Sequence, residues 1–132
     1  MRRQFSLPEA DEIFLESLGL RWETILENGS RWLLLYEYHI TEGYNHRQVI
    51  LAINIGSGYP DVQLDMVFVS PALARTDGKA IGALCSLMID GRGFQRWSRH
   101  RTAANPWRPG EDDVASHLTL VDYWFEREFK KG

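Results

Sequence analysis

The residues best suited to chemistry lie together in a short polar segment late in the chain. Ser98 and His100 are separated by one residue, and Arg99 and Arg101 alternate with them. If residues 97–101 are extended, Ser98 and His100 project to one side and the arginines to the other. A serine hydroxyl becomes a nucleophile when a base takes its proton, and His100 is placed to be that base. These residue types can supply a nucleophile, a base and cationic donors for developing negative charge.

Other side chains compete for this role. Cys85 is the single cysteine and sits among apolar residues, where a buried and inert thiol is the usual case, but it remains the alternative nucleophile. Thr102 is a further hydroxyl candidate. Ser98 can also be interpreted as an ordinary loop hydroxyl bonded to backbone, and His100 as an exposed loop histidine without a role.

Size and charge limit the class of protein. The 132 residues are 44% hydrophobic, which predicts one globular domain over residues 1–132. A formal net charge of -3 argues against a general polyanion binder, so no nucleic-acid partner is expected. The charge is unevenly distributed, because residues 92–108 contain five arginines and no acid, whereas residues 1–27 contain six acids.

The composition also indicates the surroundings of the protein. A lone cysteine cannot form an internal disulfide, and no apolar run is long enough for a signal peptide or a bilayer span. We therefore expect a cytoplasmic protein with no membrane partner. The spacings of the histidines and Cys85 match no metal-ligand pattern, so neither a metal nor a cofactor is expected.

Periodicity predicts an α+β fold that begins with a helix. Ser6 and Glu9 suit a capped helix start, and apolar residues then recur at helical spacing up to Gly19. A meander of four antiparallel strands should follow, with Asn28-Gly29 as the turn of its first hairpin. The expected strands are residues 20–26, 31–40, 48–55 and 62–69.

The second half of the chain should position the polar segment. Periodicity largely disappears between Ser70 and Gly110, which predicts a long irregular loop, and loops of this length are usually functional. Asp112 or Asp113 can then cap a final helix. The apolar stripe of that helix is Val114, His117, Leu118, Val121, Trp124 and Phe125.

This order of elements, together with particular residues, resembles the ubiquitin-conjugating enzyme fold. Tyr59-Pro60 is similar to the bend that precedes the fourth strand in that family, and residues 107–110 (Trp-Arg-Pro-Gly) to the element that leads into the next helix. Ser70-Pro71-Ala72 stands where the family usually has a His-Pro-Asn triplet. The tryptophan, arginine and asparagine pattern of residues 90–110 resembles the bacterial branch called prokaryotic family E.

The resemblance implies an activity. Such a protein accepts the carboxyl terminus of a bacterial ubiquitin-like protein from an activating enzyme and transfers it to a target amine, in operons of a kind associated with antiviral defence. In the family the nucleophilic cysteine lies shortly before the tryptophan-proline element; the matching distance back from Trp107 leads to Arg99, beside Ser98, whereas Cys85 lies 22 residues upstream of Trp107. The resemblance thus implies a serine oxyester at Ser98, formed without the usual asparagine amide.

Two other functions remain open on the sequence. A non-catalytic adaptor of the same fold would bind a ubiquitin-like protein without a covalent bond, and the missing triplet favours it. An RNA-binding module is the third possibility, because residues 92–108 interleave arginines with aromatic side chains. The acidic first helix is interpreted either as a docking site for the activating enzyme or as a solvated helix face.

Overall fold

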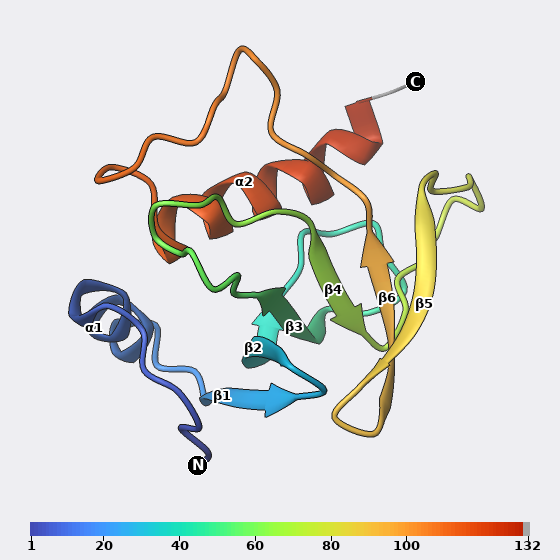
Figure 1. The fold of residues 1–132 in the computed structure, drawn as a ribbon. Helices are drawn as coiled ribbons and strands as arrows, with labels where there is room; N and C mark the ends of the chain where they lie inside the picture. The colour runs from blue at the N-terminus through green and yellow to red at the C-terminus, as the bar shows by residue number, and fades with distance from the viewer. Residues whose placement is uncertain (131–132) are drawn as a thin grey trace.

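The computed structural model describes residues 1–130, which form two α-helices and one antiparallel sheet of six strands (Figure 1). The elements in chain order are α1 (Glu9–Ser17), β1 (Trp22–Glu27), β2 (Ser30–His39), β3 (Gln48–Asn54), β4 (Val67–Ser70), β5 (Leu84–Ile89), β6 (Arg92–Trp97), α2 (Val114–Arg127) and the short 3-10 helix η1 (Glu128–Lys130). The strand order across the sheet is β1-β2-β3-β4-β6-β5. The α+β class is therefore confirmed.

The largest difference from expectation lies in residues 70–110. These residues were expected to form one long irregular loop beside a sheet of four strands, but they contain the β5–β6 hairpin, and β6 pairs with β4. Asp90 and Gly91 form the turn with φ of 53° and 72°. Asp-Gly is a strong hairpin signal, and glycines and arginines on both sides of it obscured the strand alternation.

Smaller differences concern the ends of elements. Helix α1 begins at Glu9 with Pro8 as its N-cap and has no side-chain cap, so the cap expected from Ser6 is wrong. The fourth strand begins at Val67 rather than at residue 62, because turns and bends occupy residues 57–62 and the chain enters the strand only after residue 66. The expected hairpin turn at Asn28-Gly29 is confirmed, with φ of 49° and 79°.

Helix α2 is built as its sequence indicates. The Asp113 side chain accepts a hydrogen bond from the Ser116 backbone N–H at 3.0 Å, and the Ser116 hydroxyl accepts one from the Asp113 N–H at 2.9 Å. This reciprocal capping satisfies two N–H groups at the helix start. All six residues of the expected stripe are buried, and they form one core with alternate residues of β2, β3 and β4.

The other face of the sheet carries a second core, although no helix within residues 1–130 covers it. Its buried members are Ile25, Trp32, Leu34, Ala52, Phe68, Ile89 and Phe94. The sheet closes over them by curling, so that the β5–β6 turn reaches the end of β1 (Figure 1). The Asp90 N–H donates to the Glu27 carboxylate at 3.0 Å across this closure.

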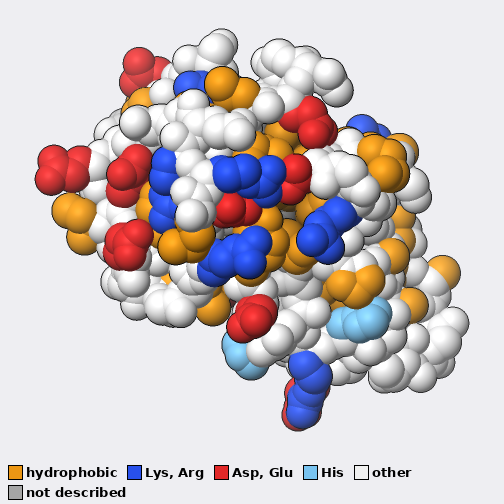
Figure 2. All heavy atoms as spheres, turned by 90° about the horizontal axis from the view of Figure 1, so that it is seen from below, with side chains coloured by type: hydrophobic (Ala, Val, Ile, Leu, Met, Phe, Trp, Pro, Cys, Tyr) orange, Lys and Arg blue, Asp and Glu red, His pale blue; other side chains and the backbone are white. Residues whose placement is uncertain are grey.

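Arg2 holds the curl together. Its guanidinium donates to both carboxylate oxygens of Asp90, at 2.8 and 2.7 Å, and to Glu23 Oε1 at 2.9 Å. The Tyr36 hydroxyl donates to the same Glu23 oxygen at 2.7 Å. We call these four residues the Arg2 junction; Figure 2, seen from below, shows arginine and acidic side chains interspersed on this face.

Within residues 1–130 neither α-helix has the length and apolar character needed to cross a bilayer.

Candidate functional site

The expected site residues lie where β6 ends and β5 begins. Ser98 directly follows β6, and its backbone N–H donates to the Ala83 oxygen at 3.1 Å. The Arg99 N–H donates back to the Trp97 oxygen at 2.9 Å, so the chain turns tightly at Ser98. The extended run expected for residues 97–101 is therefore wrong, and strand alternation does not place Ser98 and His100 on one side.

Ser98 itself is half-buried. Its hydroxyl makes no hydrogen bond to any group in residues 1–130, including His100. The structure therefore keeps Ser98 as a candidate without joining it to its expected base.

His100 has a carboxylate partner that the sequence did not indicate. Its Nδ1 lies 2.8 Å from Asp65 Oδ2, and its side chain is 59% exposed. A carboxylate at Nδ1 fixes the orientation of an imidazole and favours the proton on that nitrogen, which leaves Nε2 as the acceptor. The Met66 N–H, next to Asp65, donates to the Arg99 oxygen at 3.2 Å and ties the two segments together.

Asp65 was not among the residues expected at the site. It lies just before β4, and β4 pairs with β6, so the sheet brings it to the segment that follows β6. Its other oxygen, Oδ1, is buried and has no hydrogen-bond partner within residues 1–130. The long separation between Asp65 and His100 explains why spacing along the chain could not reveal the pair.

His117 lies close behind this pair, in α2. It is fully buried, and burial lowers its pKa to about 4, so the ring is neutral at pH 7. Its Nε2 lies 2.9 Å from the Met66 oxygen, which makes Nε2 the protonated nitrogen. His117 therefore holds Met66, the residue between Asp65 and β4, by a hydrogen bond from the protein interior and does not reach solvent.

Arg99 is a packing residue in this conformation. Its Nη2 donates to Glu128 Oε1 at 2.9 Å, with both side chains largely buried, and Nη1 donates to the Gly82 oxygen at 3.1 Å. The guanidinium also lies over the Trp97 ring, 4.9 Å from its centroid. These contacts occupy the group that was expected to stabilise an oxyanion. Arg99 instead holds the turn at Ser98 against η1.

Arg101 extends under the loop that joins β6 to α2. Its side chain is 5% exposed and lies over the Trp107 ring, 4.8 Å from the centroid. Trp107 donates from Nε1 to the Pro60 oxygen at 3.0 Å, and Trp97 is fully buried, so both tryptophans pack the loop onto the domain. Within residues 1–130, Arg101 makes no hydrogen bond to Ser98. Thr102, the further hydroxyl candidate, is exposed.

The alternative nucleophile, Cys85, is placed differently from expectation. It was expected to be buried, but its side chain is exposed on β5, which is an edge strand. It pairs with Arg96 of β6, whereas Leu84 pairs with the buried Trp97. The apolar residues around Cys85 suggested burial. Cys85 shares a sheet face with Leu87 and Ile89 of the second core, but it lies at the other end of the edge strand, where it is exposed.

Comparison with known sequences agrees with this fold. Residues 7–128 match the family described as Prokaryotic E2 family E. Neither the curated proteins nor the solved structures gave a match. The match covers nearly all of the chain and includes both helices and all six strands. The chain therefore belongs to Prokaryotic E2 family E and has the general conjugating role of an E2-like protein, which works with a ubiquitin-like protein and an activating enzyme.

Proposed function

We propose that the protein carries the carboxyl terminus of a bacterial ubiquitin-like protein as an ester on Ser98. In the first step Ser98 Oγ attacks the carbonyl carbon of the activated tail, and His100 Nε2 takes the hydroxyl proton. The bond to the activating enzyme breaks, and its leaving group takes the electron pair and that proton. Acyl transfer of this kind needs an activated nucleophile, because a serine hydroxyl is weak at its free pKa.

The observation that carries this proposal is the Asp65–His100 pair. The 2.8 Å contact at Nδ1 orients the ring, and the exposed Nε2 side remains open to an incoming group. Asp65 is a positioning residue, since it acts through His100. The Ser98 hydroxyl, two residues away in the chain, has no competing partner within residues 1–130.

The second step delivers the tail to an amine on a target protein. The amine nitrogen attacks the ester carbonyl carbon, the bond from that carbon to Ser98 Oγ breaks, and Oγ regains a proton through His100. Ser98 and His100 are not hydrogen-bonded before substrate arrives. Catalytic hydrogen bonds often shorten only in the substrate complex, so we expect docking of the tail to bring these two side chains together.

The decisive experiment looks for the covalent carrier. The protein, its operon-encoded activating enzyme, the ubiquitin-like protein and ATP are mixed, and adducts are separated by electrophoresis with and without thiol reductant. The ester adduct should survive reductant, be cleaved by hydroxylamine, and vanish in Ser98→Ala. In Ser98→Cys the adduct should become sensitive to reductant.

Matched variants separate catalysis from folding. Ser86→Ala removes an exposed hydroxyl from the nearby β5–β6 hairpin and should leave the adduct intact. Asp65→Asn and His100→Gln should slow formation and change its pH profile, and a purely structural effect would leave that profile unchanged. An adduct that persists in Ser98→Ala overturns the assignment.

A thioester on Cys85 is the second candidate, because the thiol is exposed on an edge strand. Its adduct would be lost with reductant and in Cys85→Ala. The absence of any adduct in both conditions would favour a non-catalytic adaptor that binds the ubiquitin-like protein. An antiviral-defence operon remains the proposed setting, and the neighbouring genes test it directly.

A further inference from the structure

A second candidate site lies between the loop after β6 and α2. Two adjoining hollows there have volumes of about 300 Å³ and about 490 Å³. They share four lining residues, namely Arg101, Asn105, Leu120 and Tyr123. We call this combined hollow the Arg101 pocket. Ser98 does not line it, whereas His100, the proposed base, lines the smaller hollow, so the pocket adjoins the proposed ester site.

Arg101 is an unusual residue to find in such a place. Its side chain is only 5% exposed, yet its guanidinium makes no hydrogen bond to any group in residues 1–130. Its one ion pair is long, 3.8 Å from Nη1 to Asp112 Oδ2. Buried polar groups are almost always hydrogen-bonded, and a guanidinium has five N–H donors. Folding has thus placed an arginine under the loop without using its donors.

The packing of Arg101 leaves those donors well oriented. One face of the guanidinium lies over the Trp107 ring, and this contact does not use the N–H groups, which lie in the guanidinium plane. Asp112 is held by the Arg108 backbone N–H at 2.7 Å, on the same oxygen that faces Arg101. A flat, fixed fork of donors matches the two oxygens of a carboxylate.

The charged residues that line the pocket favour a ligand with one negative charge. Arg127 lines the smaller hollow and has no ion pair within the described chain. Arg101 and Arg127 supply two positive charges, and Asp112 supplies one negative charge. His100 is matched by Asp65. The sum favours a monoanion over a dianion.

The other lining residues indicate which chemical group is attached to the anion. Thr102 and Asn105 can donate hydrogen bonds at the rim, while Leu120, Tyr123 and Trp124 form a largely apolar wall from α2. Ligand pockets commonly combine such a wall with a few polar groups that fix orientation. We propose that the Arg101 pocket binds a carboxylate attached to a hydrocarbon or aromatic group, with the carboxylate on Arg101.

This inference does not rest on acyl transfer, and it is tested without activating enzyme or ATP. 3-Phenylpropionate is titrated into the full chain, and binding is followed by tryptophan fluorescence and by the indole N–H signals in nitrogen-15 NMR spectra. The neutral 3-phenylpropionamide is the matched control. We expect the amide to bind at least tenfold more weakly and the Trp107 signal to move with the acid.

Variants locate the carboxylate. Arg101→Met should abolish the difference between acid and amide, and Arg127→Gln should weaken the acid a few-fold. Arg108→Gln removes an arginine from the same loop that does not line the pocket, so it should leave binding unchanged. Thermal melts show whether each variant folds. If Arg101→Met does not fold, the binding of acid and amide is compared in Arg127→Gln and Asn105→Ala instead.

Several outcomes would overturn the proposal. Equal binding of the acid and the amide would mean that the pocket is only an apolar hollow filled by solvent. Tighter binding of inorganic phosphate than of the carboxylate would replace a monoanion with a dianion. An equal loss in Arg108→Gln would mean that the arginines act only through their long-range field.

Discussion

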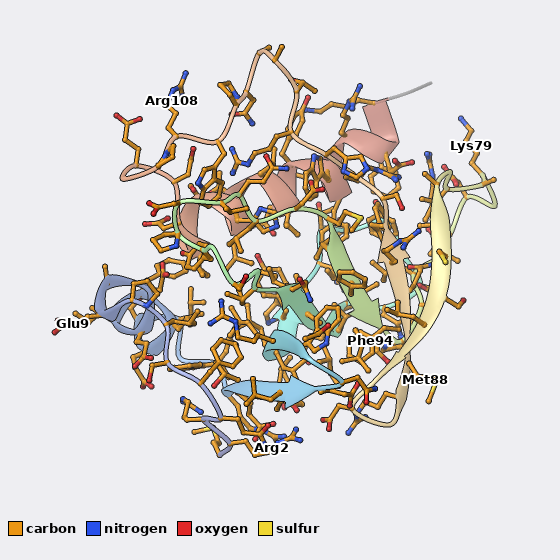
Figure 3. All side chains as sticks on the ribbon, in the orientation of Figure 1. Arg2, Glu9, Lys79, Met88, Phe94 and Arg108 are labelled. Atoms are coloured by element: carbon orange, nitrogen blue, oxygen red, sulfur yellow. The ribbon has the colours of Figure 1, made fainter. Side chains whose placement is uncertain are left out.

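Two arginines at opposite ends of the molecule are treated in contrasting ways. Arg2, at the lower edge in Figure 3, is 39% exposed and still makes short hydrogen bonds to two carboxylates. Arg101 belongs to the loop that carries Arg108 at the upper edge, is 5% exposed, and makes none within residues 1–130. The more buried cation is therefore the less satisfied one.

The difference separates an arginine whose donors are used in the fold from one whose donors are left without partners within residues 1–130. At the Arg2 junction the hydrogen bonds of Arg2 lower the pKa of Glu23 to about 2, so the carboxylate stabilises the fold over the whole neutral range. At the upper end Asp65 and His117 also have buried polar atoms without partners. Native proteins concentrate such unsatisfied groups at functional sites, because satisfying them belongs to the ligand or substrate.

The largest expected effect is the loss of folding stability in acid that protonation of His117 causes. The pKa of His117 is about 4 in the folded protein and about 6.5 when unfolded, so the unfolded chain binds more protons between these values. Stability should therefore fall by about 3 kcal/mol as the pH drops from 6.5 to 4. Urea unfolding at a series of pH values measures this, and His117→Gln should flatten that interval.

Glu23 provides the contrasting acid response. Its stabilisation is present above pH 4.5 and is lost as the pH falls towards 2, so Glu23→Gln should leave the interval above pH 4.5 unchanged. If Glu23→Gln and His117→Gln remove the pH dependence of stability over the same pH range, the two ends of the molecule are not electrostatically separate.

The next effect is removal of the satisfied arginine. Arg2→Met should destabilise the fold by about 2 kcal/mol, because it leaves the Glu23 carboxylate, only 6% exposed, with no cation closer than Arg21 at 3.7 Å. Chemical denaturation gives the value. Arg47→Met is the matched control, since the Arg47–Glu42 pair is exposed, and it should cost less than about 0.5 kcal/mol.

A moderate effect is expected at the start of α2, the helix that forms one wall of the Arg101 pocket. Asp113→Ala removes the N-cap and should cost about 1 kcal/mol. Glu111→Ala, an exposed acid just before the helix, should change stability by less than about 0.5 kcal/mol. Equal losses in thermal melts would mean that general charge, rather than the cap, stabilises the helix.

The smallest effect should come from the unsatisfied arginine. Arg101→Met replaces a buried charge by an apolar side chain of similar length and should change stability by less than about 1 kcal/mol in either direction. The same denaturation experiment as for Arg2→Met provides the comparison. A loss as large as that of Arg2→Met would show that Arg101 is structural and would remove the contrast between the two ends.

Sequence reasoning reached the parts of the fold that depend on local patterns. The stripe of α2, the cap at Asp113 and the turn at Asn28-Gly29 follow from spacing and backbone preference, and all three are present. The β5–β6 hairpin was missed although Asp90-Gly91 signalled its turn. Its strands are short, and arginine and glycine at several positions weaken the apolar alternation that identifies a strand.

The site was less accessible than the fold. Ser98 was predicted from the resemblance and His100 from its place two residues further on, and that pairing stays a prediction. Asp65 reaches His100 only through the pairing of β4 with β6. The lack of hydrogen bonds at Arg101 likewise depends on where Trp107 and Asp112 settle. Contacts between distant segments follow from strand order, and strand order is not encoded in any one stretch of sequence.

The closure at Arg2 also bears on the order in which the chain folds. Arg2 and Asp90 are 88 residues apart in sequence, so their contact closes a very long loop. Contacts between such distant residues slow folding, because the loop entropy is lost before the contact stabilises the chain. Arg2 is synthesised before the β5–β6 turn and must wait for it. The second core, with Trp32 and Phe68, is therefore incomplete until the β5–β6 hairpin supplies Ile89 and Phe94.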